Sequence, residues 1–103
     1  MIESKLIVPV KYNDGHAVRI DFFADLERQL VDAFGGVTYH TATGCWKKPR
    51  STVFVREEVI IYTIAHPDDS TWTAAVLDFA RSVKKDLTQD AVYVSIGGKV
   101  EFV

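Results

Sequence analysis

The chain has 103 residues, of which 48% are hydrophobic and 25% charged, and its formal net charge is -2. This length predicts one domain, residues 1–103, with enough apolar material for a core. The near-neutral charge excludes a global attraction to nucleic acid, and no run of about 20 apolar residues predicts a membrane span. A single cysteine cannot close an internal disulfide and the N-terminus lacks a signal-peptide pattern, so we expect a cytoplasmic protein.

The first predicted elements are a strand and a helix. Residues 6–12 alternate like a strand, but Pro9 cannot donate to a ladder and suggests an edge, a bulge or the end of pairing. Asp21 is the expected N-cap of a helix whose apolar residues recur every three or four positions. Gly35 and Gly36 are its expected C-terminal stop, because glycine adopts the left-handed conformation without strain.

The centre of the chain predicts a long β-hairpin with a basic tip. Its first strand, residues 37–46, is rich in Thr, Tyr and Val, and Gly44 suggests a bulge or bend. Its second strand covers about residues 52–65, and the charged residues 56–58 suggest a bulge or a segment beyond the sheet edge. Residues 59–64 are apolar on both faces, which is typical of a strand that is covered on both sides.

The C-terminal third predicts a second helix and two short strands. Asp69 or Ser70 is the expected N-cap of the helix. Residues 91–96 form a predicted strand, which Gly97 and Gly98 connect by a two-residue turn to the short strand 99–103. The order strand, helix, strand, strand, helix, strand predicts an α+β fold of the ferredoxin-like, split βαβ type. Two helices would cover one face of an antiparallel sheet, with a short extra strand at the C-terminus.

The other face of this sheet is expected to have no helix over it. On the strand 52–65, Tyr62 and Ile64 fall on one side, while Val59 and Ile61 fall on the other. An uncovered apolar face is typical of an interface or a ligand site, and pairing with a second copy is the simplest way to bury it.

Several short segments resemble an uncharacterised bacterial family of small ferredoxin-like proteins. They are Phe-Gly-Gly-Val-Thr at 34–38, Gly-Cys-Trp at 44–46, a glutamate at 57 or 58, His-Pro-Asp-Asp at 66–69 and Gln-Asp-Ala-Val-Tyr-Val at 89–94. The resemblance covers roughly residues 13–94 and implies the ferredoxin-like fold. It implies no activity and no catalytic residue.

The candidate catalytic residues are His40, Cys45 and Tyr62. A cysteine nucleophile needs a base, and strand alternation places Cys45 on the opposite face from His40 unless a bulge resets the register. The structural alternative is a strand cysteine that packs as a small apolar group. No complete set of nucleophile, base and orienting group is present, so the sequence leaves open whether the chain is an enzyme.

The candidate ligand-binding residues are Trp46, Lys48 and Arg50, an aromatic ring beside cations at the hairpin tip. Phosphates and bases suit such a set, but the aromatic signature of RNA-recognition sheets is absent, so nucleic acid is disfavoured. The histidines and the aspartates at 68 and 69 lack the spacing of a metal site. We therefore predict no metal and no cofactor.

The leading hypothesis is a small cytoplasmic module that binds a small molecule or a protein and acts as a homo-oligomer through its open sheet face, without a membrane. The first alternative is an enzyme of the dimeric α+β-barrel kind that acts on a small apolar substrate. There His40, as acid or base, would share a face with Trp46 and Tyr62. The second alternative is a nucleic-acid binder that uses the basic tip.

Overall fold

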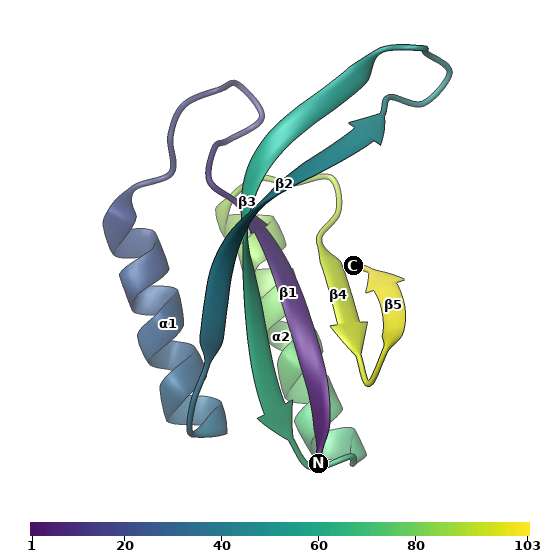
Figure 1. Cartoon of the computed structure of the whole chain (residues 1–103). Helices are drawn as coiled ribbons and strands as arrows, with labels where there is room; N and C mark the ends of the chain where they lie inside the picture. Colours follow the sequence, from purple (N-terminus) through teal and green to yellow (C-terminus); the bar gives the residue numbers. More distant parts are fainter.

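A computed structural model describes all 103 residues, and it contains two helices and one antiparallel sheet (Figure 1). The elements are β1 (Ile2–Pro9), α1 (Ile20–Phe34), β2 (Thr38–Lys47), β3 (Phe54–His66), α2 (Ser70–Asp86), β4 (Tyr93–Ile96) and β5 (Lys99–Phe102). The five strands lie in the order β2-β3-β1-β4-β5. The predicted α+β, ferredoxin-like fold with an extra C-terminal strand is confirmed.

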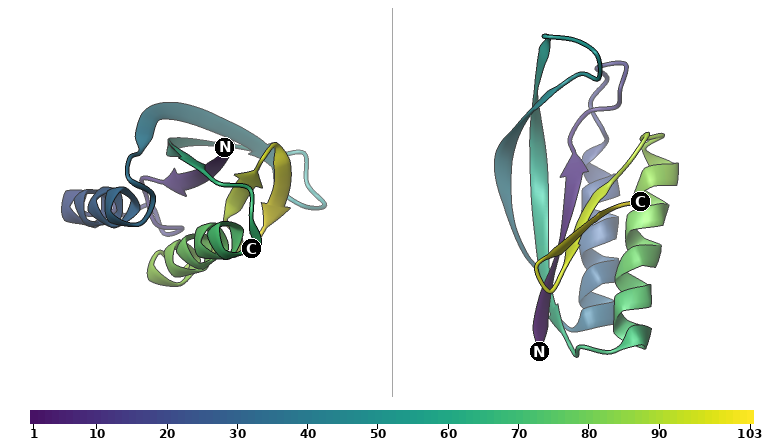
Figure 2. Two further views of the ribbon diagram at one scale, coloured as in Figure 1. Left: turned by 90° about the horizontal axis from the view of Figure 1, so that it is seen from below. Right: turned by 90° about the vertical axis from the view of Figure 1, so that its right-hand side faces the viewer.

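Both helices cover the same face of the sheet (Figure 2). The core between the layers combines Leu6 of β1, Tyr62 of β3 and Val94 of β4 with Leu30 of α1 and Val76 of α2, and each of them is almost fully buried. The alternation predicted for β3 is therefore confirmed on its buried side. Neither helix is long and apolar enough to cross a membrane.

The ends of the helices agree with the sequence in two places and disagree in one. Gly35 has a φ of 85° and its N–H donates to the carbonyl of Val31, so the predicted stop of α1 is confirmed. Asp69 caps α2, because its carboxylate accepts a 3.1 Å hydrogen bond from the N–H of Trp72. The N-cap of α1 is Arg19, so the prediction of Asp21 is wrong. Asp21 lies in the first turn, where its carboxylate pairs with the Arg19 guanidinium at 3.2 Å.

The β2–β3 hairpin is regular over its whole length. Its ladder runs without interruption from Thr38 opposite Thr63 to Lys47 opposite Phe54. The bulges expected at Gly44 and at residues 56–58 are therefore wrong. The far half of the hairpin extends beyond the helices (Figure 1), and residues 56–58 pair with β2 alone, because the β1 ladder ends at Val59. Arg56 and Glu58 are exposed there, whereas Glu57 is half-buried.

Pro9 ends a central strand. β1 lies between β3 and β4, so the expectation of an edge strand is wrong. The ladder to β4 covers only Ser4 to Leu6, which means that Pro9 lies beyond it and needs no donor on that side. Of the three explanations for Pro9, the end of pairing is the one confirmed.

His66, the last residue of β3, is completely buried and hydrogen-bonded through both ring nitrogens. Nδ1 lies 2.8 Å from the carbonyl oxygen of Pro67, which only accepts, so Nδ1 carries the proton. Nε2 therefore accepts from the buried Ser4 hydroxyl at 2.6 Å. The imidazole also stacks on Trp72 and packs beside Phe34. These contacts make His66 part of the core.

Candidate functional site

The open face of the sheet carries a pocket of about 560 Å³, which is within the usual range for small-molecule sites. Its floor consists of Ile7 and Pro9 of β1 and Val59 of β3, and Pro9 pairs directly with Val59 across the ladder. Figure 2 (left) shows the β2–β3 hairpin curving toward β4 and β5 on the side away from the helices. This curvature makes the open face concave.

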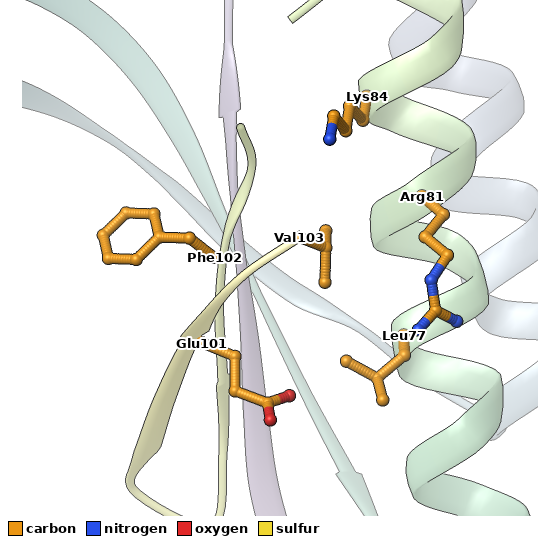
Figure 3. Close-up of a pocket in the computed structure, with 6 residues that line it drawn as sticks. All are labelled: Leu77, Arg81, Lys84, Glu101, Phe102 and Val103. Atoms are coloured by element: carbon orange, nitrogen blue, oxygen red, sulfur yellow. The ribbon is translucent and has the colours of Figure 1, made fainter. Parts of the chain in front are cut away.

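Three aromatic side chains line this open-face pocket: Trp46 of β2, Tyr93 of β4 and Phe102 of β5. Tyr93 and Phe102 are opposite each other in the ladder, with ring centroids 5.6 Å apart in an edge-to-face arrangement. Figure 3 shows the Phe102 ring projecting away from α2. Phe102 is 70% exposed and Trp46 is 44% exposed, so both rings offer apolar surface to a ligand.

Glu57 brings a carboxylate to the same pocket. It lies on β3 opposite Gly44, which has no side chain to cover it, and it forms no ion pair with any cation of the chain. Partial burial raises the pKa of the Glu57 carboxyl above its ordinary value. An unpaired, partly desolvated carboxylate beside aromatic rings suits a ligand that carries a positive charge.

The remaining side of the pocket is polar and comes from two loops. Asn13 follows β1, and Gln89 and Asp90 precede β4. A hydrogen bond of 3.3 Å from the Gln89 amide to Asn13 Oδ1 joins the two loops. Thr88, beside them, has a φ of 51°, which is strained for a β-branched residue. Such strain is typical of segments that hold a site in a defined shape.

The structure separates the three residues expected to act in catalysis. His40 is exposed on the open face, but it does not line the pocket. Tyr62 lies in the core, where its hydroxyl donates to Glu27 at 2.7 Å, and burial and then this carboxylate raise the pKa of Tyr62. The expectation that they share a face is wrong, because Tyr39 rather than His40 pairs with Tyr62. Cys45 is exposed at the pocket wall, and its role stays a prediction.

The candidate ligand-binding residues are also divided. Trp46 lines the open-face pocket, whereas Lys48 and Arg50 line a separate hollow that is formed only by residues 47–52 of the tip. No aromatic ring lines that hollow. Binding of nucleic acid at the tip stays a prediction.

No sequence pattern marks Asn13, Gln89, Tyr93 and Phe102 as members of one site. For Tyr93 a signal existed, because strand alternation places it opposite the core-facing Val92 and Val94. For the two amides no local pattern existed, since they lie 76 residues apart in the chain.

A further pocket of about 580 Å³ lies between α2 and β5 (Figure 3). Leu77, Arg81 and Lys84 face Glu101 and Val103 there. Arg81 also pairs with Asp78 of its own helix, at 3.3 Å. No cluster of three or more His, Cys, Asp or Glu residues is arranged to hold a metal ion.

No protein-family model and no curated protein matches the sequence. Among solved structures, the fold is similar to that of a phage SAM lyase in complex with S-methyl-5'-thioadenosine, with a TM-score of 0.76 and 16% identity over 98% of this chain and 87% of that one. A phage SAM lyase in the apo state gives a TM-score of 0.68 and 15% identity over 96% of this chain and 82% of the other. At these identities the likeness shows the fold alone.

Proposed function

We propose that this chain binds SAM in the open-face pocket and cleaves it as a lyase, releasing S-methyl-5'-thioadenosine. The observation that carries the proposal is the unpaired Glu57 carboxylate in a pocket lined by Trp46, Tyr93 and Phe102. SAM joins a sulfonium cation to a purine nucleoside. A carboxylate and aromatic faces attract the cation, and aromatic faces also stack on the purine. The fold shared with a phage SAM lyase supports this choice of ligand.

The reaction breaks the bond between the sulfonium sulfur and Cγ of the amino-acid part. The electron pair of that bond stays on sulfur, which becomes the neutral thioether of S-methyl-5'-thioadenosine. A lyase adds no water, so a carboxylate oxygen of the four-carbon fragment bonds to Cγ as the bond to sulfur breaks, and the fragment leaves as a lactone. Ring closure neutralises the negative charge of the substrate carboxylate and the positive charge of the sulfonium. A poorly solvated site favours this step, because the transition state carries less charge than the substrate.

The residues of the chain have separate parts in this proposal. The Glu57 carboxylate attracts the positive charge of the substrate. The apolar floor of Ile7, Pro9 and Val59 excludes water from the bond that breaks. Trp46 stacks on the nucleoside or on the sulfonium, and its position at the pocket wall makes it accessible for either contact.

Incubation of the purified protein with SAM is expected to produce S-methyl-5'-thioadenosine faster than a blank without protein, as measured by liquid chromatography and mass spectrometry. The Trp46→Ala variant is expected to lower kcat/KM by about 10- to 100-fold, since aromatic stacking contributes about 1–3 kcal/mol per base. Lys48→Ala is the control, because Lys48 lies outside the pocket. A rate equal to the blank at every protein concentration contradicts the proposal.

A second candidate function is the oligomeric interaction module, and exposed apolar residues at the rim of the open face favour it. Val100 is 46% exposed and Phe102 is 70% exposed on β5. We expect native mass spectrometry at micromolar concentration to show a dimer or a larger oligomer, and Val100→Asp to shift it toward the monomer. A wild-type monomer contradicts this assembly. An oligomer without any SAM cleavage leaves the interaction module as the better function.

A further inference from the structure

The side-chain amide of Gln89 is held in one orientation at the border of the open-face pocket. Its Nε2 lies 3.1 Å from the carbonyl oxygen of Leu87 and 3.3 Å from Asn13 Oδ1. A backbone carbonyl only accepts hydrogen bonds, so the atom that faces it must be the amide nitrogen. Asn13 is fixed in the same way, because its Nδ2 donates to the carbonyl oxygen of Thr88 at 3.2 Å. Rotation of the Gln89 amide by half a turn would place its Oε1 against the carbonyl oxygen of Leu87. The same rotation of the Asn13 amide would place its Oδ1 against the carbonyl oxygen of Thr88.

This orientation decides what Gln89 can offer to a ligand. Both hydrogens of its Nε2 are used by partners within the chain. Its Oε1 accepts from no group of the chain, and no buried side-chain oxygen or nitrogen lacks a partner, so Oε1 is accessible from outside. Gln89 therefore presents an acceptor and no donor.

Gln89 and Glu57 line the open-face pocket from opposite sides of β1. Glu57 comes from β3 on one side of β1, whereas Gln89 leads into β4 on the other side of β1. Both residues line the same pocket. A ligand whose positive charge lies at Glu57 can therefore extend its base across β1 toward Gln89.

We propose that Gln89 Oε1 accepts a hydrogen bond from the 6-amino group of adenine and thereby selects adenine over 6-oxo purines. The inference rests on the proposed SAM site and adds to it the residue that reads the base. Hypoxanthine carries a carbonyl in place of the amino group, so two oxygens with lone pairs would face each other. A site that leaves polar groups unpaired discriminates strongly against such a ligand.

The test compares the dissociation constants of S-methyl-5'-thioadenosine and S-methyl-5'-thioinosine by isothermal titration calorimetry. The wild type is expected to bind the adenine nucleoside at least about tenfold more tightly, which is the effect of about 1.4 kcal/mol. Gln89→Ala is expected to remove most of this preference by weakening only the adenine nucleoside. Gln89→Met, which retains the bulk without an acceptor, should behave like Gln89→Ala. Gln29→Ala on α1 is the matched control, because Gln29 lies outside the pocket.

The outcomes separate this inference from the proposed function. Equal binding of the two nucleosides by the wild type, or an unchanged preference in both Gln89 variants, overturns the role of Gln89 while SAM binding stands. Absence of binding of either nucleoside overturns the proposed function and the inference with it. A preference that Gln89→Ala and Gln89→Met both lose, and that Gln29→Ala keeps, supports the inference.

Discussion

Replacement of Glu57 by glutamine is expected to lower kcat/KM for SAM by about 100-fold, because removal of one partner of a partly desolvated charge pair costs at least about 2–3 kcal/mol. The amide of Glu57→Gln retains the shape of the side chain but has no charge with which to balance the sulfonium. Initial rates of S-methyl-5'-thioadenosine formation measure the effect. Activity of the wild type should also fall as the pH falls through the raised pKa of Glu57, because only the ionised carboxylate attracts the cation.

The same substitution is expected to raise thermal stability slightly at neutral pH. The pKa of Glu57 is higher in the folded protein than the ordinary value, so the folded state binds the proton more tightly than the unfolded state. Stability therefore decreases as the pH rises from the unfolded pKa to the folded pKa, and the ionised form remains unfavourable above it. Removal of the charge relieves this cost, and we expect Tm to increase by a few degrees at most.

Glu58→Gln provides the matched control for both measurements. Glu58 is the neighbour of Glu57 on β3, but it is exposed and its side chain points to the other face of the sheet. We expect its activity and Tm to remain close to those of the wild type. Equal losses of activity in the two variants contradict a specific role for Glu57.

Replacement of His66 by alanine is expected to lower the free energy of unfolding by about 3 kcal/mol or more. The substitution leaves a cavity beside Trp72 and Phe34 and removes the only partner of the buried Ser4 hydroxyl. Loss of a buried ring is strongly destabilising because it leaves a cavity. A buried hydroxyl that is left without a partner adds a further large cost. Urea denaturation monitored by circular dichroism measures the change.

A double-mutant cycle isolates the Ser4–His66 hydrogen bond from the packing of the ring. His66→Phe keeps an aromatic ring but leaves the Ser4 hydroxyl without a partner. The double variant Ser4→Ala with His66→Phe should therefore be more stable than His66→Phe alone, because both polar groups are gone. If the losses of stability in Ser4→Ala and in His66→Phe add up to the loss in the double variant, the hydrogen bond is contradicted. His40→Ala, at an exposed position, should change stability by less than about 0.5 kcal/mol.

The order and type of the elements follow from patterns that are local in the chain. Apolar residues recur at helical spacing in 21–34 and 70–87, so they lie on one face and pack into a core together only if these segments are helices. The alternation in 38–47 and 93–96 suits strands. Asp69 and the glycines at 35 and 97–98 mark element ends through their own backbone chemistry, which the structure reproduces. The exception is Asp21, where an ion pair with Arg19 replaced the expected cap.

The composition of the site depends on contacts that no local pattern contains. The register between β2 and β3 places Tyr39, and not His40, opposite Tyr62. Because Tyr62 is on the face of β3 that packs on the helices, His40 lies on the other face of the sheet. A shift of one residue would exchange these faces, and only the packing of the whole sheet on the helices selects between the two.

The sequence by itself determined the α+β fold, its two helices on one face and an uncovered apolar face opposite them, because hydrophobic periodicity is a property of neighbouring residues. Only the tertiary structure decided which side chains meet on that face. Glu57, Gln89 and Phe102 come from three separate segments, and the order β3-β1-β4-β5 together with the curvature of the hairpin brings them to one pocket. Such proximity arises from strand order and twist, which are set by long-range contacts and not by any single stretch of the chain.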